Sequence, residues 1–381
     1  MFEKCLTLNI PLAINLTVPL CLLALEIFHH QRKNIRKGDI NCLKYKMSIY
    51  KDILVRFPRG GLSYVFAYGS GVKQQIGYDQ VGKQKDCVID LVFCVRDPLG
   101  WHAENISRHE SHYSAMRHLG PKLIMKYQEN LGAGVYFNTL VPLPDLGVQI
   151  KYGVISKEQM LQDLLEWRHL YMAGRLHKPV QDIVPADDDK EIKAALAMNL
   201  RNAFQVALLL LPERFTTFEL FHTISSLSYK GDFRMIFGEN KNKVANIVRA
   251  QEKDFFQLYA PVMKDLSQYV AVDFAAKEKG SDRVVTQFEQ DKSEKALEYH
   301  LRQAPAELRR RLIRNAAFTG SYIDIIQNLA ALKNLHKIVQ VSVNDIVWRS
   351  SIKQSVKNIP SAGLFKSIVY SYRKALKTFS H

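Results

Sequence analysis

A change in hydrophobic pattern near residue 156 constrains the fold of this 381-residue chain more than any other feature. Before it, short runs rich in Val, Ile, Phe and Tyr alternate with segments of helical periodicity. After it, the apolar residues recur almost only at helical spacing. We therefore expect an α+β fold, in which strands and helices over about residues 45 to 155 precede an almost wholly helical region.

The expected strands are four apolar runs bounded by glycine, proline or polar residues, at 62–68, 87–95, 134–140 and 147–155. Helical patterns are expected over three further segments. The first covers 43–57, and the second covers 101–129 with a break near His109. The third starts after Ser156, which has Gln159 at capping-box spacing, and extends to about Ala173.

Three consecutive aspartates, Asp187, Asp188 and Asp189, precede a long apolar-periodic run over 190–211. Such a triplet can bind a metal or cap a helix. Aspartate oxygens accept hydrogen bonds from the first-turn amides and complement the helix dipole. We therefore interpret the triplet as a helix cap.

The composition indicates a reducing compartment and an anionic partner. The five cysteines show no CxxC spacing, which argues against a zinc site or a disulfide framework. The excess of 53 Lys and Arg over 37 Asp and Glu favours nucleotide phosphates, nucleic acid or acidic lipid as partners. No acidic residue follows Asp345, so the C-terminal tail is the most basic part of the chain.

The first residues form an apolar and basic extension, which we assign to 1–44. Residues 5–25 carry no charge, and a basic stretch follows over 29–37, as in a signal anchor or a short membrane span. The alternative is that translation normally begins lower down, for instance at Met47, so that this extension is no part of the working protein.

The stretch "YVFAYGSGV" ends the first expected strand in Gly69, Ser70 and Gly71. Glycine allows close backbone approach and the turn amides are donors, so this turn suits a polyphosphate. Asp90 lies in the apolar run "VIDLVF", where a carboxylate is unfavourable unless it binds a metal or accepts hydrogen bonds. Together they predict nucleotidyl transfer with Mg²⁺ at Asp90. The alternatives are a plain tight turn, and an aspartate satisfied by backbone amides or a lysine.

Nine sequence blocks occur in an order that closely resembles the mitochondrial translocator assembly and maintenance protein family. That family is the mitochondrial CDP-diacylglycerol synthase, also called mitochondrial phosphatidate cytidylyltransferase. The resemblance extends from about Tyr50 to the C-terminus. The blocks are "FAYGSGV", "VIDLVF", "DPLGWH", "SHYS", "LGPKLI", "GAGVYFNTL", "IKYGVIS", "DLLEWRHLYMAGRLHKPV" and "LSYKGDFRM".

The resemblance implies a domain organisation. A nucleotidyltransferase-fold domain with a mixed β-sheet is expected over 45–158, and a helical, winged-helix-like domain over 159–345. A basic amphipathic tail is expected over 346–381. Gly69 and Ser70 match the Gly-Ser motif of the fold and Asp90 its metal carboxylate, so we predict Ser70 and Asp90 as catalytic residues.

The resemblance also implies a reaction. CTP and phosphatidic acid would give CDP-diacylglycerol and pyrophosphate, with Mg²⁺ as cofactor, in the first committed step toward cardiolipin. The protein would be peripheral, on the matrix side of the mitochondrial inner membrane. The acceptor phosphate is already anionic, so no strong general base is needed. His102 and His112 are therefore as well interpreted as hydrogen-bonded packing residues.

A second metal carboxylate is not obvious. In the wider superfamily two carboxylates flank one residue on this strand, whereas here valines stand on either side at that spacing. Asp86 would lie about 13 Å from Asp90 on an extended strand, too far to share a metal ion. We predict Asp97, just past the strand, as the second metal ligand and a catalytic residue, ahead of Asp145.

Three cationic residues are predicted to bind the nucleotide phosphates. Lys151 lies on the last expected strand, with a solvated lysine as the alternative. Lys230 and Arg234 lie in "LSYKGDFRM", with a surface ion-pair turn as the alternative. Lys122, near an expected helix start, has a weaker claim.

The tail "GLFKSIVYSYRKALKTFSH" predicts a membrane-binding helix. Its apolar residues fall within about 100° of helical arc, and its cations occupy the neighbouring face. That pattern is typical of an interfacial helix on acidic lipid, with a packed terminal helix as the alternative. The residues predicted to bind the membrane are Phe365, Ile368, Lys366, Arg373, Lys374 and Lys377.

Two other functions stay open on the sequence alone. One is a nucleotidyltransferase that acts on RNA or another acceptor, which would also explain the basic charge. The other is a non-catalytic factor that maintains a protein translocase. With the lipid reaction as the main prediction, the expected partners are CTP, phosphatidic acid and an acidic membrane surface, and no nucleic acid is expected.

Overall fold

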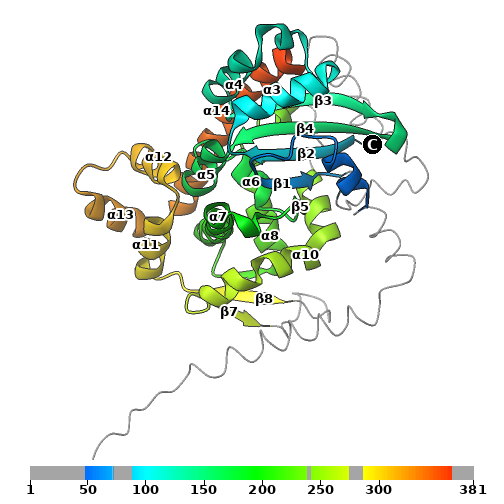
Figure 1. Ribbon diagram of the computed structural model, residues 1–381. Helices are drawn as coiled ribbons and strands as arrows, with labels where there is room; N and C mark the ends of the chain where they lie inside the picture. Colours follow the sequence, from blue (N-terminus) through cyan, green and yellow to red (C-terminus); the bar gives the residue numbers. More distant parts are fainter. Residues whose placement is uncertain (1–47, 71, 73–87, 238–241, 274–285, 363–381) are drawn as a thin grey trace, which may run out of the picture.

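The structure is a computed structural model that describes residues 48–70, 72, 88–237, 242–273 and 286–362. It has the α+β architecture that the sequence predicts. A β-sheet lies between one group of helices that includes α3 and α4 and a second group that includes α5, α7 and α8 (Figure 1). A smaller sheet lies at the opposite end of the second group.

The larger sheet has the strand order β3-β4-β2-β1-β5 within the described residues. Strands β2 and β4 are parallel and the other neighbouring pairs are antiparallel, which confirms the predicted mixed sheet. Since β2 is the central strand, a charged residue on it lies in the middle of the sheet. The strands are β1 (Leu62–Tyr68), β2 (Val88–Val95), β3 (Val135–Leu143), β4 (Val148–Ser156) and β5 (Gln181–Val184).

The helices surround this sheet on both faces. A helix over residues 48–54 precedes β1, within the predicted 43–57. In chain order the others are α3 (Pro98–Arg108), η2 (Glu110–His112), η3 (Ala115–Leu119), α4 (Pro121–Asn130), η4 (Pro144–Leu146), α5 (Lys157–Glu166), α6 (Met172–Leu176), η5 (Ala186–Asp188), α7 (Lys190–Leu210), α8 (Thr217–Ser226), α9 (Arg234–Phe237), α10 (Lys243–Asp265), α11 (Glu294–Gln303), α12 (Ala306–Ala316), α13 (Tyr322–Ala330) and α14 (Leu335–Ala362).

The two faces of the sheet pack against different helices because strand side chains alternate in direction. On β2, Leu91 belongs to the core that contains Trp101 of α3. Its neighbour Val92 belongs to the core that contains residues of α5, α6 and α7. Asp90 precedes Val92 by two residues, so it lies on the face that is covered by α5, α6 and α7.

Helix α5 begins as predicted but ends earlier. The Ser156 hydroxyl accepts a hydrogen bond from the Gln159 amide at 3.3 Å, which confirms the cap. The predicted extension to Ala173 is wrong, since the chain turns at Trp167, which has left-handed backbone angles. The buried carboxylate of Asp163 stabilises the new path by accepting four backbone amides, those of His169, Tyr171, Met172 and Ala173.

Two further helix predictions are confirmed. The predicted break near His109 falls between α3 and η2, where His109 is the C-cap of α3. Asp189 caps α7 by accepting from the Ile192 amide at 3.3 Å, and it pairs with Lys157 at 2.9 Å. The aspartate triplet is therefore a helix start, as interpreted from the sequence.

The region after residue 155 is less uniformly helical than predicted. It contributes β5 to the larger sheet, and it forms a second, antiparallel sheet in the order β6-β8-β7. These strands have only three or four residues each, and in β8 only two of four residues are buried, so their alternation is too brief to detect. The strands of this sheet are β6 (Arg214–Thr216), β7 (Val270–Asp273) and β8 (Gln287–Gln290).

The predicted divisions at 158/159 and 345/346 stay predictions. Two structural elements connect the segments on either side of these divisions. Strand β5 pairs with β1, and α14 continues through residue 346 without a break.

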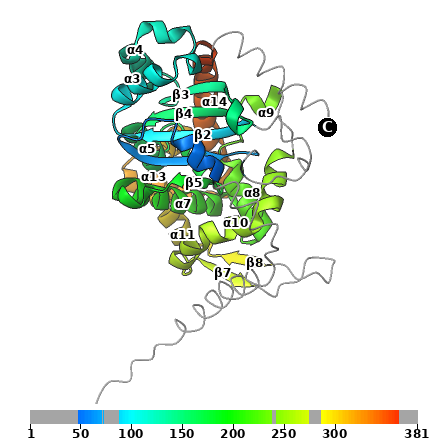
Figure 2. The same ribbon diagram turned by 45° about the vertical axis from the view of Figure 1, so that its right-hand side comes forward.

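The C-terminal half of α14 is anchored to the sheet and to α4 (Figure 2). The buried Lys357 ammonium donates to the carbonyl oxygens of Gln128 at 2.7 Å and Leu131 at 2.6 Å. Burial lowers the pKa of Lys357 to about 7. Among the described helices, none is both long and apolar enough to cross a membrane. The extension 1–44 and the predicted membrane-binding residues from Phe365 onward lie outside the described residues.

Candidate active site

Three side chains form a row across the face of the sheet that α5 to α7 cover. Tyr68 at the end of β1 pairs with Asp90 of β2, and Asp90 pairs with Lys151 of β4. The Lys151 ammonium contacts the Asp90 carboxylate at 3.1 Å, with side chains 15% and 26% exposed. It also lies 4.9 Å from the centre of the Phe137 ring. Asp90 therefore has a lysine partner, one of the alternatives that the sequence left open.

The predicted Gly-Ser turn lies directly beside this row. Gly69 has φ of +87°, a conformation that favours glycine. A Cβ atom at Gly69 would lie 3.3 Å from the Asp90 carboxylate. The structure therefore brings Gly69, Ser70 and Asp90 together, as predicted. Gly71 lies outside the described residues.

A partly buried arginine that the sequence does not predict as a site residue covers the same row. The Arg175 guanidinium of α6 lies 3.8 Å from the centre of the Tyr171 ring and 5.3 Å from that of Tyr68. It donates to the Tyr171 carbonyl at 2.7 Å. The Tyr68 hydroxyl and the Arg175 Nε have no hydrogen-bond partner within the described residues, although both are buried. Such orphaned groups are consistent with a site that binds a polar ligand.

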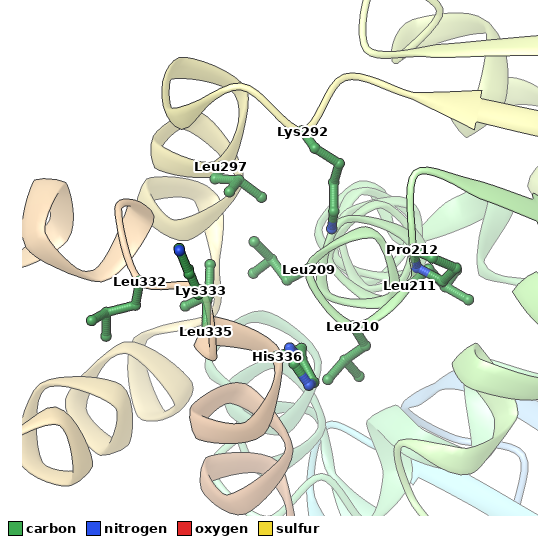
Figure 3. Close-up of a pocket in the computed structure, with 10 residues that line it drawn as sticks. All are labelled: Leu209, Leu210, Leu211, Pro212, Lys292, Leu297, Leu332, Lys333, Leu335 and His336. Carbon is green, nitrogen blue, oxygen red and sulfur yellow. The ribbon is translucent and has the colours of Figure 1, made fainter.

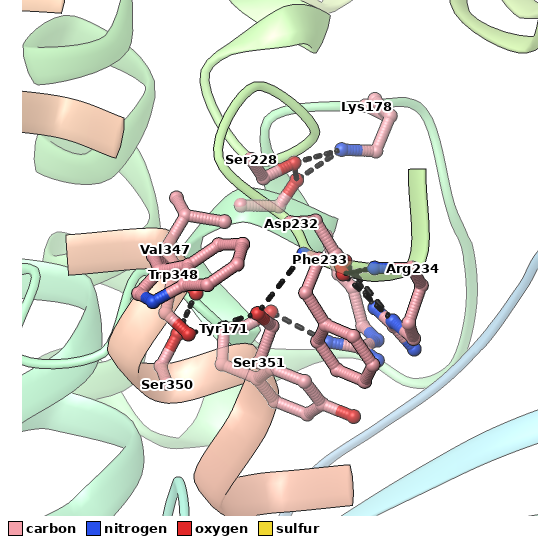
Figure 4. Close-up of polar contacts among 12 residues, drawn as sticks. Tyr171, Lys178, Ser228, Asp232, Phe233, Arg234, Val347, Trp348, Ser350 and Ser351 are labelled. Atoms are coloured by element: carbon pink, nitrogen blue, oxygen red, sulfur yellow. Dashed lines mark hydrogen bonds and ion pairs between the residues drawn. The ribbon is translucent and has the colours of Figure 1, made fainter. Parts of the chain in front are cut away.

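Arg234 approaches this group from the start of α9 (Figure 4). Its guanidinium pairs with the buried Asp232 carboxylate at 2.5 Å. Burial raises the pKa of the Tyr171 hydroxyl, but the charges of Arg175, Arg234 and Lys151 outweigh burial and hold that pKa below its usual value. Three cations from three separate elements therefore act on one tyrosine.

Lys178 extends the group of cations further (Figure 4). Its ammonium donates to the Gly174 carbonyl and to the Ser228 hydroxyl, the latter at 3.0 Å. Burial, together with the charges of Arg175 and Lys243, lowers the pKa of Lys178 to about 7. We call Lys151, Arg175, Lys178 and Arg234 the cationic cluster. A cluster of this kind suits a polyanion, because an anion offsets the burial of like charges.

The structure does not bring the other predicted carboxylates to Asp90. Asp97 follows the end of β2, and the strand from Asp90 to Val95 alone spans about 16 Å. The Asp97 carboxylate caps α3 by accepting from the Gly100 amide at 3.0 Å. Asp145 pairs with Arg56.

Two predicted lysines also lie apart from the cluster. The exposed Lys230 donates to the Gln340 side chain on α14 at 3.1 Å. Lys122 is exposed on α4. Of the pair predicted in "LSYKGDFRM", only Arg234 reaches the cluster.

The two histidines are packing residues on the opposite face of the sheet. His102 is buried and bonds to the Tyr113 hydroxyl at 2.8 Å and to the Gln128 side chain at 2.9 Å. Burial lowers the pKa of His102 to about 4, so it is neutral near pH 7. His112 bonds to the Tyr152 hydroxyl at 3.1 Å. This confirms that they are hydrogen-bonded packing residues.

An apolar cavity of about 340 Å³ lies elsewhere, between α7, α11 and the start of α14 (Figure 3). Leucines line most of it, and Lys292, Lys333 and His336 are its basic residues. No residue of the cationic cluster lines this cavity. It is therefore separate from the candidate active site.

Comparison with known proteins decides the family. The sequence profile described as "Phosphatidate cytidylyltransferase, mitochondrial" matches residues 50–377. The chain belongs to this family. A protein of that name from Drosophila melanogaster is 60% identical over 88% of this chain and 99% of its own length. Proteins of the same name from Xenopus laevis and Mus musculus are 42% and 41% identical, over 86% and 85% of this chain and 94% and 93% of their own lengths.

The membership confirms the resemblance predicted from the sequence blocks. It also gives the missed residues a context, since Tyr171, Arg175 and Lys178 all lie within the quoted block "DLLEWRHLYMAGRLHKPV". The signal was two cations three residues apart, close behind an aromatic residue. In the sequence that signal fits an ordinary helix surface equally well, so by itself it does not predict a binding site.

The candidate site of this cytidylyltransferase provides some of the ligands that a magnesium ion needs. The described residues contain no group of three or more His, Cys, Asp or Glu side chains that could hold a metal. Asp90 offers one carboxylate beside the Gly69 turn. Magnesium is commonly bound by one or two carboxylates together with substrate phosphates, so a single carboxylate is compatible with an ion that arrives with a nucleotide.

We expect Gly69→Ala to destabilise the protein by about 1–2 kcal/mol, because an L-residue is strained at a positive φ. The added methyl group would also crowd the Asp90 carboxylate. The matched control is Gly60→Ala, where the new Cβ would meet no atom within 4 Å. Urea denaturation measures both changes. Equal stability of the two variants would contradict the assigned turn.

Proposed function

We propose that this protein transfers the cytidylyl group of CTP to phosphatidate, forming CDP-diacylglycerol and pyrophosphate. It is thus a nucleotidyltransferase, in keeping with the names of its relatives. One observation carries the proposal beyond those names: the Gly69 turn, the Asp90 carboxylate and the cationic cluster meet on one face of the sheet.

In this proposal the CTP triphosphate lies along the Gly69–Ser70 turn. The turn amides and the Ser70 hydroxyl donate to phosphate oxygens, and the Lys151 ammonium balances their charge. Asp90 would hold Mg²⁺, which when bound neutralises charge on the triphosphate and on the departing pyrophosphate. Lys151 contacts Asp90 directly, so the lysine proposed to bind the nucleotide lies beside the carboxylate proposed to bind the metal.

The acceptor phosphate then attacks the α-phosphorus of CTP in line. An oxygen of the phosphatidate phosphate forms the new P–O bond, and the bond to the β-phosphate breaks, so pyrophosphate leaves with the electron pair. Arg175 and Arg234 supply fixed positive charge where negative charge accumulates, a principal source of catalytic stabilisation. The nucleophile is anionic, so no histidine base is required, in keeping with the distant and bonded His102.

The finer description of the fold belongs to this proposal. We assign a nucleotidyltransferase fold to the larger sheet, supported by the Gly-Ser turn after β1 and the carboxylate on β2. The small sheet of β6, β7 and β8 contacts α8 through β6, and α8 packs against α10, which supports a winged-helix-like second domain. The products of the reaction would feed cardiolipin synthesis.

We place the protein on the matrix side of the mitochondrial inner membrane, as a peripheral protein; the family name supports the organelle. The described part of α14 supports a membrane-facing surface. Helical spacing sets four apolar residues within about 80° of arc, with two cations beside them. These residues, which we call the α14 face, are Trp348, Ile352, Val356, Ile359, Arg349 and Lys353.

The α14 face fits an acidic bilayer. Trp348 is 43% exposed, Val356 62% and Ile359 44%. Exposed tryptophan beside aliphatic and basic side chains is typical of interfacial helices, and no acidic residue follows Asp345 in the chain. The anchored end of α14 holds this surface in a fixed relation to the sheet.

We expect purified protein with labelled CTP, Mg²⁺ and phosphatidate liposomes to produce lipid-soluble label. Asp90→Asn should reduce that product at least about 100-fold, since it removes a charge placed for the transition state. Asp97→Asn should retain activity, because asparagine also caps a helix. Circular dichroism checks that both variants are folded.

Three results would contradict the proposed reaction or the role given to Asp90. Label in added RNA instead of lipid would support another acceptor. An active Asp90→Asn enzyme would exclude Asp90 from the chemistry. Loss of activity in Asp97→Asn alone would restore the second ligand that was predicted from the sequence.

We expect the double variant Trp348→Ser and Val356→Ser to bind acidic liposomes at least about tenfold more weakly, since it removes apolar area from the bilayer contact. Leu165→Ser on α5, where the leucine is also 43% exposed, is the matched control and should bind as the wild type does. Liposome flotation measures both. Unchanged flotation of the double variant would exclude the α14 face as a membrane contact.

A further inference from the structure

Two lysines share one aromatic ring at the far end of the cationic cluster. The ammonium of Lys178 lies 5.2 Å from the centre of the Tyr229 ring, and that of Lys243 lies 5.5 Å from it. The two charges come from different parts of the chain, the segment after α6 and the start of α10. The Lys243 charge also acts on Lys178, and an anion that bound both ammonium groups would offset this repulsion.

The Lys178 side chain is held in place by its neighbours (Figure 4). The Ser228 hydroxyl accepts from its ammonium and itself donates to the Gly174 carbonyl at 3.2 Å. A Cβ atom at Gly174 would lie 2.3 Å from the Ser228 Cβ, so α6 and this loop are in direct contact. These contacts use two of the three ammonium N–H groups, and no carboxylate among the described residues forms an ion pair with Lys178.

This end of the cluster is distinct from the nucleotide end. The charges that act on Lys178 are those of Arg175 and Lys243. Tyr68, beside the Gly69 turn, is instead influenced by the charges of Lys151, Arg175 and Asp90. Arg175 adjoins both ends, since its guanidinium lies 5.3 Å from the centre of the Tyr68 ring and its carbonyl accepts from the Lys178 amide at 3.3 Å. A site with two anion-binding ends joined by one arginine suits two phosphate-bearing substrates that react with each other.

The loop beside the Lys178 end also packs on α14. Ser228 and Tyr229 begin the loop that continues to Phe233, whose amide lies 3.5 Å from the Ser351 hydroxyl of α14. A Cβ atom at Gly231 would lie 2.6 Å from the Asn344 carbonyl, so this loop packs closely on that helix. A lipid headgroup that enters beside α14 would therefore meet the loop that carries Tyr229 and leads to Arg234.

We propose that Lys178 and Lys243 bind the phosphate monoester of an anionic glycerolipid, the acceptor substrate, while Lys151 and the Gly69–Ser70 turn bind the nucleotide. Ser228 and Gly174 are positioning residues that orient the Lys178 ammonium. The inference rests on the proposed function, and it assigns the two substrates to opposite ends of one cluster.

The test is equilibrium binding of two soluble ligands to the full-length protein, without turnover. Dihexanoyl phosphatidate represents the acceptor and needs no membrane, so the α14 face does not influence the result. CTP represents the nucleotide. Lys178→Gln and Lys243→Gln should each weaken phosphatidate binding about tenfold or more and change CTP binding less than twofold, because each removes a charged hydrogen-bond donor. Lys151→Gln should do the reverse.

Lys253→Gln, an exposed lysine on the same helix as Lys243, is the matched control and should bind both ligands normally. Lys243→Gln keeps the test valid if Lys178→Gln does not fold. Lys178 and Lys243 could instead bind the terminal phosphates of CTP. Pyrophosphate binding is therefore measured as well. Weaker binding of CTP and pyrophosphate with unchanged phosphatidate binding would overturn the assignment, as would no change for any ligand.

The outcome is distinguishable from a failure of the proposed function. If the wild type makes no CDP-diacylglycerol in the liposome assay, the reaction is wrong. The binding data still report whether Lys178 and Lys243 hold a lipid phosphate. If the wild type is active but both glutamine variants bind phosphatidate normally, only the subsite is wrong.

Discussion

The contact between Asp90 and Lys151 is the interaction on which the candidate site depends. It joins the central strand β2 to β4 in register, on the face that the helices α5 to α7 cover. A lone carboxylate in the middle of a sheet is unfavourable, and the neighbouring ammonium makes it tolerable. The same register places Tyr68 on the other side of Asp90, so the end of β1 and its glycine turn must lie beside both charges.

The cationic cluster follows from how the later chain covers that row. Asp163 gathers four backbone amides, and this turns the chain out of α5 and into α6. That turn sets Arg175 over Tyr171 and Tyr68. Asp232, just before α9, and Arg234, at its start, lie on the side of the row that faces α14. The positions of three of the four cations therefore depend on packing between segments distant in sequence. The positive charge gathered there makes binding of an anionic ligand favourable.

The sequence predicts the parts of the candidate site that are local. Gly69, Ser70 and Asp90 were found because a glycine turn and a charge inside an apolar strand are visible within thirty residues. Lys151 was found from strand alternation. Arg175 and Lys178 were missed because only tertiary packing shows that their side chains face the sheet. Asp97 was named because it is near Asp90 in sequence, and an aspartate before a proline-led helix serves equally well as a cap, which is the role it has.

The most direct test of the account is a crystal structure with Mg²⁺ and the CTP analogue whose α,β-bridging oxygen is a methylene group. The account predicts triphosphate density between the Gly69–Ser70 turn and Lys151, with the metal at Asp90 and the α-phosphate toward Arg175. Triphosphate density centred on Lys178 and Lys243, or on another face of the sheet, would contradict it.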